Sequence, residues 1–86
     1  SVVITGAGHG IGKALALRFA REGARIVAAD VDEDAARQTA DEIGTPARAF
    51  RCDVANEQDI RDLVAAAGHI DLFCSNAGIL AEGGLE

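Results

Sequence analysis

The stretch "TGAGHGIG", Thr5 to Gly12, decides how this chain of 86 residues is interpreted. It follows the apolar run "SVVI" and precedes "KALALRFAREG", whose apolar residues recur at helical spacing. A plain turn from strand to helix needs one or two glycines, but this stretch has Gly6, Gly8 and Gly10 as well as Gly12. Glycine permits positive φ angles and close approach of another group to the backbone. Because main-chain amides at a helix N-terminus bind anions, the stretch predicts a phosphate-binding loop.

Apolar runs and helical patterns alternate along the rest of the sequence. This alternation, with short connections, implies a parallel sheet with right-handed crossovers. We therefore predict an α/β fold, a doubly wound parallel sheet with strand order 3-2-1-4 and a ligand crevice between strands 1 and 4. The first two helices are expected on one face and the third on the other. Strands are expected at 1–5, 24–30, 47–52 and within 69–78, and helices at 11–23, 31–44 and 56–68.

Helix ends and faces are also predicted from the residue pattern. Helical spacing places Ile11, Leu15 and Phe19 on one stripe of the first helix. Asp32 precedes an acidic first turn and is the expected N-cap of the second helix, and Asn56 is that of the third.

Composition limits the possible partners. About half of the residues are apolar and only three are aromatic, which is typical of a parallel sheet covered by helices. The formal charge of −6, without a basic run, argues against nucleic acid or an anionic membrane as a partner. No apolar segment approaches the roughly 20 residues of a membrane span. The two cysteines, Cys52 and Cys74, are interpreted as ordinary buried thiols in a cytoplasmic protein, and no metal site is expected.

The glycine spacing identifies a family resemblance. The common G-x-G-x-x-G pattern does not fit, whereas T-G-x-x-x-G-x-G does, at Thr5, Gly6, Gly10 and Gly12. This pattern resembles the cofactor loop of the short-chain dehydrogenase/reductase family, Rossmann-fold oxidoreductases that use NAD or NADP. The resemblance implies a Rossmann-like fold, here as a partial doubly wound sheet.

Three further motifs extend the resemblance over essentially the whole chain. Asp30, at the end of the second strand, matches the ribose-binding position of the family. "CDV" at 52–54 matches the Asp-Val that lies against adenine, and "SNAG" at 75–78 matches the Asn-Asn-Ala-Gly after the fourth strand. Ser75 departs from that motif, because the family has Asn there. The four motifs occur in the family's order and on the expected elements.

The resemblance implies roles for individual residues. Gly6 would permit the turn, Gly10 and Ile11 would contact the pyrophosphate, and Gly12 would let the first helix pack close to the sheet. His9 has two interpretations, facing the phosphates or lying in a solvated turn, and we favour the second. The predicted cofactor-binding residues are Gly6, Gly8, His9, Gly10, Ile11, Gly12, Asp30, Val31, Asp53, Val54, Asn76, Ala77 and Gly78.

Residues at the ends of the second, third and fourth strands have alternative interpretations. Asp53 and Val54 would contact adenine by the resemblance, but Asp53 could instead be a turn or cap residue before the third helix. The segment from Asn76 to Gly78 would run beside a cofactor ribose, or be a simple strand end. Asp30 could cap the second helix, but Asp32 fits that role better.

Asp30 also predicts which nucleotide is preferred. A carboxylate there can accept hydrogen bonds from both hydroxyls of the adenosine ribose. It would repel a 2′-phosphate, since a unit charge pair at ~4 Å is worth about 1 kcal/mol in water and about 4 at an effective dielectric near 20. No Arg or Lys lies within three residues of Asp30. We therefore predict NAD as the cofactor, with NADP disfavoured.

The family's catalytic residues are not found in the sequence. Family members use Ser with a Tyr-x-x-x-Lys pair, whereas this sequence has no Tyr and its one Lys is Lys13, in the first helix. We therefore assign no catalytic residue. We expect 1–86 to be the N-terminal part of a single NAD(P)-binding domain, from a homo-oligomeric oxidoreductase acting on an alcohol or carbonyl compound. The alternatives are a non-catalytic dinucleotide-binding module or sensor, and an interaction domain without a nucleotide.

Overall fold

The computed structural model describes residues 1–44 and 47–75. Within these residues strands and helices alternate strictly, as the hydrophobic pattern predicts. The elements are β1 (Val2–Thr5), α1 (Gly10–Arg21), β2 (Ile26–Asp30), α2 (Glu33–Ile43), β3 (Arg48–Arg51), α3 (Glu57–Ala67) and β4 (Leu72–Ser75).

The four strands form one parallel sheet in the order β3-β2-β1-β4. Val3 of β1 lies opposite Val27 of β2 on one side and Phe73 of β4 on the other. The central strands β1 and β2 are buried over their whole length, because their apolar side chains face helices on both sides of the sheet. The predicted strand order is confirmed.

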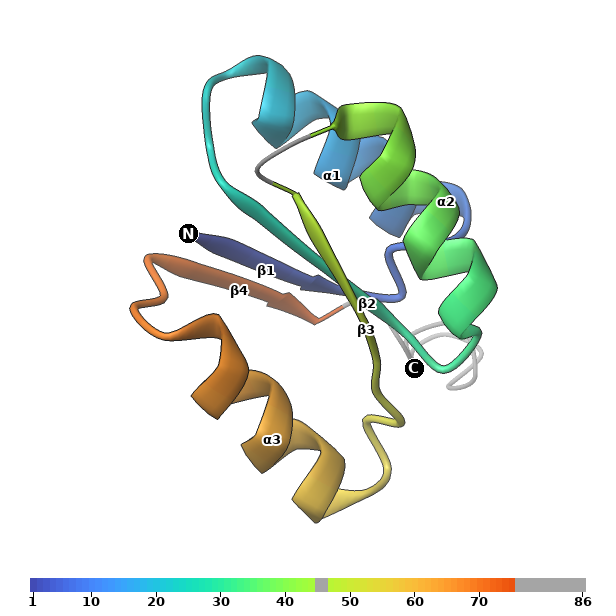
Figure 1. The fold of residues 1–86 in the computed structure, drawn as a ribbon, viewed down its shortest axis with the longest axis vertical. Coiled ribbons are helices and arrows are strands. Elements are labelled where there is room, and N and C mark those ends of the chain that lie inside the picture. Colours follow the sequence, from blue (N-terminus) through green and yellow to red (C-terminus); the bar gives the residue numbers. More distant parts are fainter. Residues whose placement is uncertain (45–46, 76–86) are drawn as a thin grey trace, which may run out of the picture.

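Helices cover both faces of the sheet, as Figure 1 shows: α1 and α2 lie on one face and α3 on the other. The core is accordingly divided into two clusters. Ile4, Ala16 and Ile26 belong to the cluster beneath α1 and α2. Val27 and Leu63 belong to the cluster beneath α3. The predicted distribution of helices is therefore confirmed as well.

The capping residues of the last two helices are those predicted. The Asp32 carboxylate accepts a hydrogen bond from the Ala35 amide at 3.2 Å, where α2 begins. The Asn56 side-chain oxygen accepts one from the Asp59 amide at 3.0 Å, where α3 begins. In each helix the cap satisfies an amide that has no intrahelical partner.

The apolar stripe of α1 is not buried along its whole length. Leu15 and Phe19 are half-buried against the core, but Ile11 is 70% exposed. The innermost positions of α1 are instead the small residues Gly12 and Ala16, which allow the closest approach to the rest of the fold. A pattern counted on large apolar side chains could not locate that contact.

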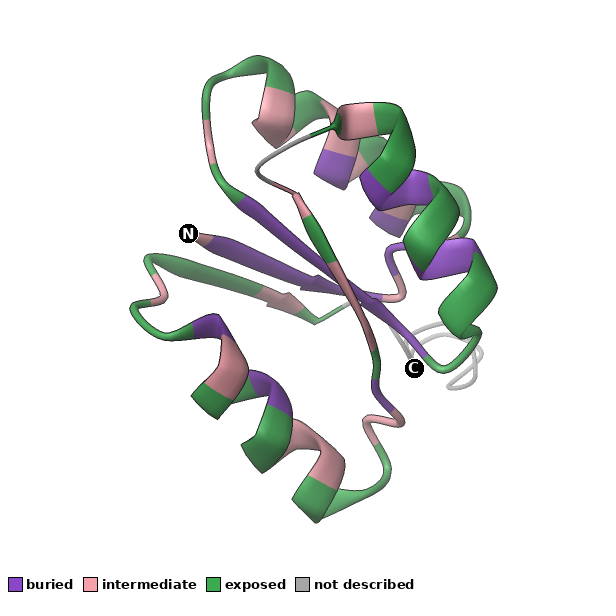
Figure 2. Ribbon diagram, in the orientation of Figure 1, coloured by how far each residue is buried: buried purple, intermediate pink, exposed green. Residues whose placement is uncertain are grey.

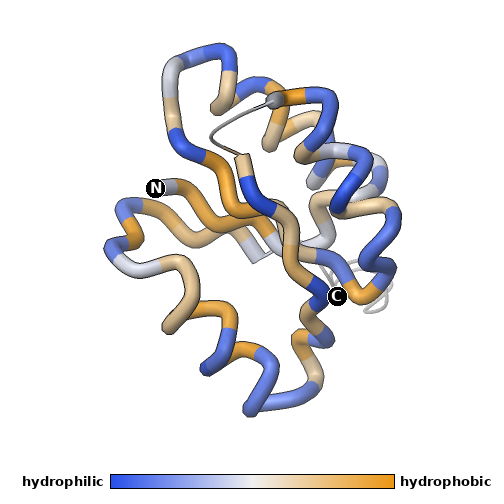
Figure 3. Tube along the Cα trace, viewed as in Figure 1, coloured by the Kyte–Doolittle hydropathy of each residue, from blue (hydrophilic) through white to orange (hydrophobic). Residues whose placement is uncertain are grey.

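The edge strand β4 is less covered than the centre of the sheet. Among the described residues it pairs only with β1, and Leu72 and Phe73 remain 42% and 37% exposed. Figure 2 shows the contrast with the buried central strands, and Figure 3 shows that β4 is nevertheless largely hydrophobic. None of the described helices has the length and apolar character needed to cross a bilayer.

Candidate functional site

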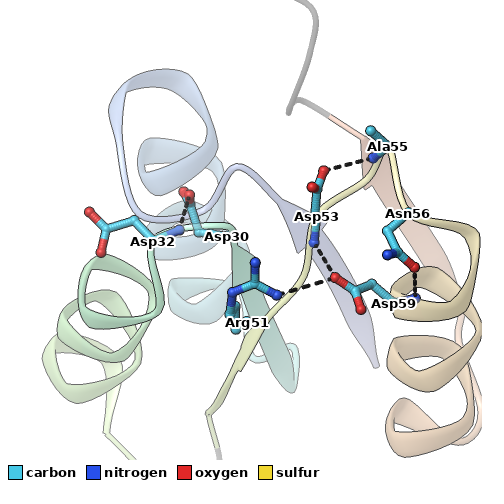
Figure 4. A network of polar contacts seen from close by, with 7 residues as sticks. All are labelled: Asp30, Asp32, Arg51, Asp53, Ala55, Asn56 and Asp59. Carbon is cyan, nitrogen blue, oxygen red and sulfur yellow. Dashed lines mark hydrogen bonds and ion pairs between the residues drawn. The ribbon is translucent and has the colours of Figure 1, made fainter.

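The carboxyl ends of the strands bring the predicted site residues to one edge of the sheet. Thr5, which ends β1, is level with Ser75, which ends β4, and Asp30, which ends β2, is level with Arg51 of β3. Figure 4 shows Asp30 and Asp53 beyond neighbouring strands, with the Arg51 side chain between them in this view. The carboxyl end of β1, from which the glycine loop begins, therefore lies between those of β2 and β4.

Two contacts explain why this loop requires glycine. A Cβ on Gly12 would lie 2.0 Å from the carbonyl oxygen of Gly6, so the start of α1 packs directly against its own loop. A Cβ on Gly8 would lie 2.4 Å from the Ala35 Cβ, so the loop also packs against the first turn of α2. Both distances are shorter than any real Cβ contact. Gly6 and Gly10 in addition have positive φ angles of 67° and 52°.

Three hydrogen bonds join the glycine loop to β2 and α2. The Ala7 amide, two residues beyond the end of β1, donates to the Ala29 carbonyl of β2 at 2.9 Å. The Gly8 amide donates to Asp30 Oδ2 at 2.9 Å. The hydroxyl of Thr39, which is fully buried in α2, donates to the Ala7 carbonyl at 2.9 Å. The loop conformation is thus determined jointly by β2 and α2.

The carboxylate of Asp30 is the acidic group closest to the glycine loop in this network. Its Oδ2 accepts from Gly8, its Oδ1 accepts from the Asp32 amide at 3.0 Å, and the residue is only 6% exposed. Asp32 is the cap of α2, so Asp30 is not needed for that role. Each carboxylate oxygen can accept a second hydrogen bond. Asp30 therefore retains acceptor capacity at the edge of the site.

The start of α1 differs from that of the other two helices. Its N-cap is His9, whose backbone is extended (φ −143°, ψ 154°) and whose side chain makes no capping hydrogen bond. The first turn also contains no acidic residue. The amides of Gly10, Ile11 and Gly12 have no intrahelical acceptor, and the positive end of the helix dipole lies behind them. This arrangement suits an anion.

His9 itself is exposed beside the loop. Its Nε2 lies 3.5 Å from Asp32 Oδ2, and both side chains are more than half exposed. The pair bridges the start of α1 and the start of α2 across the surface. Ile11 and Val31, two further predicted residues, are large apolar side chains that remain exposed near this edge.

Asp53 takes part in a polar network before α3 (Figure 4). Its Oδ1 accepts from the Ala55 amide at 2.9 Å, and its own amide donates to Asp59 Oδ2 at 3.0 Å. Arg51 forms an ion pair with the Asp59 carboxylate at 3.3 Å. Val54 is half-buried and packs against the core beneath α3. Asp53 therefore does form the turn that was considered as its alternative role, and its other oxygen makes no bond within this network.

A family comparison agrees with this geometry. The family model described as short chain dehydrogenase matches residues 1–86. The chain belongs to the short-chain dehydrogenase family.

Similar proteins are found in bacteria and plants. The chain is 43% identical over 83 residues to 7alpha-hydroxysteroid dehydrogenase of Escherichia coli (strain K12), covering 88% of this chain and 32% of that protein. It is 41% identical over 83 residues to the sex determination protein tasselseed-2 of Zea mays, covering 91% of this chain and 25% of that protein. The chain thus spans about a quarter to a third of the length of these relatives.

A solved structure of the same family has a closely similar fold. The 3-ketoacyl-(acyl-carrier-protein) reductase of Brucella melitensis, in its complex with NADH, superimposes with a TM-score of 0.81 at 41% identity. The match covers 84% of this chain and 31% of that one. The similarity therefore includes a family member that binds a nicotinamide dinucleotide.

The remaining polar groups do not form a second site in the described part of the chain. Burial, and then the carboxylates of Asp59 and Asp53, raise the pKa of the Cys52 thiol, which keeps it neutral. Cys74 lies on β4, at the opposite side of the sheet, and both thiols are free. His69 pairs with Asp71 at 3.0 Å before β4, away from the strand ends described above. Residues 1–44 and 47–75 contain no group of three or more side chains suited to a metal ion.

The structure adds residues that the sequence did not point to. Thr39 and Ala35 both contact the glycine loop, although neither belongs to a family motif that we identified. The sequence did contain a signal for this contact: small residues share one face of the predicted second helix, and a single Thr lies among alanines there. Asn76, Ala77 and Gly78 lie outside the described residues, so their predicted contacts with a ribose remain predictions.

Proposed function

We propose that the protein containing this chain is an NAD-dependent oxidoreductase that transfers hydride between the nicotinamide and a small alcohol or carbonyl compound. In this proposal, residues 1–86 supply the dinucleotide-binding half of the domain. Family membership supports the class of reaction. The observation that carries the binding role is the uncapped start of α1 beside the Asp30 carboxylate.

The described residues fit a dinucleotide by their donors and by their shape. The pyrophosphate would lie against the amides of Gly10, Ile11 and Gly12, where no acidic side chain competes for them. The loop that precedes these amides packs so closely on α1 and α2 that a Cβ at Gly8 or Gly12 would collide. This close packing keeps the amides in position before a ligand arrives, which reduces the entropy lost on binding.

The adenosine end of the nucleotide would lie beside Asp30. The carboxylate is oriented by two main-chain amides and can still accept hydrogen bonds from ribose hydroxyls. Val31 and Ile11 offer exposed apolar surface for a purine ring at the same edge. Asp53, by the resemblance, would accept a hydrogen bond from the adenine amino group.

Charge supports NAD rather than NADP. A 2′-phosphate would approach Asp30, and the exposed carboxylate of Asp32 is close by. The first arginine after Asp30 in the chain, Arg37, is paired with Glu33 at 3.1 Å, and Arg51, which is level with Asp30 on β3, is paired with Asp59 at 3.3 Å. Repulsion of about 1.4 kcal/mol changes affinity tenfold, so we expect a preference for NAD of roughly ten- to a thousandfold.

The chemistry of the reaction belongs to the nicotinamide, which carries the hydride when it is bound. The part of the chain described here binds and orients the nucleotide. The glycine loop fixes the diphosphate, Asp30 fixes the adenosine ribose, and together they would direct the nicotinamide half along the crevice between β1 and β4.

A titration of the full-length protein with the two nucleotides tests the proposal. We expect NAD to bind in the micromolar range that is usual for cofactors and substrates, and NADP at least tenfold more weakly. Equal or tighter binding of NADP would contradict the assigned specificity. Absence of binding for both nucleotides would remove the proposed function altogether.

A further inference from the structure

The strongest feature that the proposed function leaves unexplained is the buried hydroxyl of Thr39. This side chain is fully buried on α2, and its neighbours on the same face, Ala35, Ala36 and Ala40, are small and apolar. Burial of a hydroxyl is unfavourable unless it forms a hydrogen bond. Here the hydroxyl donates at 2.9 Å to the carbonyl of Ala7, which is itself fully buried in the glycine loop.

The partner of Thr39 belongs to the same peptide group as the partner of Asp30. The Ala7 carbonyl and the Gly8 amide are the two polar ends of one planar peptide unit. The Thr39 hydroxyl donates to the oxygen at 2.9 Å, and Asp30 Oδ2 accepts from the nitrogen at 2.9 Å. A rigid plane that is held at both ends cannot rotate about the line joining its two Cα atoms without breaking both bonds.

The consequence concerns the Asp30 carboxylate. If this peptide turned over, the Ala7 carbonyl oxygen would face Asp30 in place of the Gly8 amide. Two oxygen acceptors would then oppose each other, and the carboxylate would lose one of the two amides that orient it. Since Gly8 also packs against Ala35, α2 contacts both residues that share this peptide, Ala7 through Thr39 and Gly8 through Ala35.

We propose that Thr39 is a positioning residue for the dinucleotide: its hydroxyl fixes the peptide between Ala7 and Gly8 and so aims the Asp30 carboxylate at the adenosine ribose. The inference rests on the proposed function, because it assumes that Asp30 binds the ribose. It assigns to α2 a part in cofactor selection through a residue that does not touch the cofactor.

Two substitutions that differ by one oxygen atom test this role. Thr39→Ser keeps the hydroxyl, Thr39→Ala removes it, and both lose the same methyl group. In the full-length protein, the Kd for NAD should stay within about twofold of wild type for Thr39→Ser and rise about tenfold for Thr39→Ala, the usual weight of one hydrogen bond. Thr39→Val, which keeps the side-chain volume and lacks the hydroxyl, should behave as Thr39→Ala does.

The ratio of the two nucleotide affinities separates positioning from simple stability. A misaligned Asp30 loses its bonds to the ribose. Thr39→Ala should therefore lower the affinity for NAD about tenfold and that for NADP only about twofold. A variant that is merely destabilised would lose affinity for both nucleotides equally. Ile26→Val, at the end of β2 farthest from Asp30, provides a destabilised control whose ratio should match wild type.

Each outcome decides the question. Equal affinities in Thr39→Ser and Thr39→Ala, or a ratio unchanged from wild type in Thr39→Ala, would overturn the positioning role while leaving NAD binding intact. If the wild-type protein binds neither nucleotide, the proposed function fails and the inference falls with it.

Discussion

The three helices begin at similar loop-to-helix junctions, but their first amides are satisfied in different ways. At α2 and α3, Asp32 and Asn56 cap the helix, and acidic residues occupy the first turn. At α1 the N-cap residue is His9, which forms no cap, and the first turn contains no acid. A helix that only needed stability would benefit from both features. The difference supports the proposal that the α1 amides bind an anionic ligand, at some cost in helix stability.

Filling the space behind the α1 amides should have the largest effect. In Gly12→Ala the new Cβ would meet the Gly6 carbonyl oxygen at 2.0 Å, so the start of α1 must move away from its loop. We expect the affinity for NAD to fall at least ~100-fold, which corresponds to about 2.8 kcal/mol. Isothermal titration calorimetry of the full-length variant measures this loss.

Gly68→Ala is the matched control. Gly68 has a positive φ of 74°, but nothing lies within 4 Å of the position of its Cβ. This variant should lose about 1–2 kcal/mol of unfolding free energy from backbone strain and retain its affinity for NAD. If Gly12→Ala bound NAD as well as Gly68→Ala does, the close contact would not matter for the site.

Giving α1 a capping side chain, as α2 and α3 have, should raise the stability of the protein and lower its affinity for NAD. The extended backbone of His9 already has N-cap geometry, so Asn at this position should add about 0.5–1 kcal/mol to the unfolding free energy. His9→Asp adds a negative charge beside the proposed diphosphate, and the affinity for NAD should fall about 10- to 100-fold. Chemical denaturation and nucleotide titration of both variants give the two quantities.

The comparison between the two His9 variants separates the effect of the capping hydrogen bond from the effect of the added negative charge. In His9→Asn the new side chain engages one amide, so the affinity for NAD should fall only about threefold, which corresponds to roughly 0.7 kcal/mol. An aspartate variant with wild-type affinity would mean that the phosphates lie elsewhere.

Neutralising Asp30 should reduce nucleotide discrimination. Asp30→Asn retains one side-chain oxygen, which can accept from the Gly8 amide, and loses the hydrogen bond from the Asp32 amide together with the repulsion of a 2′-phosphate. The ratio of NAD to NADP affinity should fall about tenfold, close to 1.4 kcal/mol. Asp34→Asn changes the same charge in the exposed first turn of α2 and should leave the ratio unchanged. An equal fall in both variants would indicate a general field effect and no specific contact by Asp30.

Removing a cap that has no ligand role should affect stability alone. Asn56→Ala leaves the Asp59 amide without its acceptor and should lower the unfolding free energy by about 1 kcal/mol. The urea midpoint should fall, and the Kd for NAD should stay within about twofold. A substantial loss of affinity would show that the start of α3 contributes to the site.

The sequence predicted the features that depend on periodicity and on local chemistry. The alternation of elements, the strand order, the distribution of helices over the two faces and the caps Asp32 and Asn56 are confirmed. The alternation and the caps follow from patterns within single segments, and the strand order and helix distribution follow from the doubly wound arrangement of right-handed crossovers.

Contacts between segments distant in sequence could not be predicted in this way. The bond from Thr39 to Ala7 joins residues whose proximity exists only after α2 has packed on the loop. Helical spacing placed Ile11 on one stripe with Leu15 and Phe19, yet the close approach of α1 is made by Gly12 and Ala16. Small residues carry little hydrophobic signal, so their role in packing emerges only from the tertiary structure.

The most direct measurement follows the glycine amides of the full-length protein by NMR, with ¹⁵N-glycine labelling, during titration with ADP and with adenosine. If α1 binds the diphosphate, ADP should shift the Gly10 and Gly12 amide signals strongly, and adenosine should shift them little. Gly44 and Gly68, where α2 and α3 end, should respond to neither ligand. Unchanged Gly10 and Gly12 signals at saturating ADP would contradict the assignment of the α1 amides as the phosphate site.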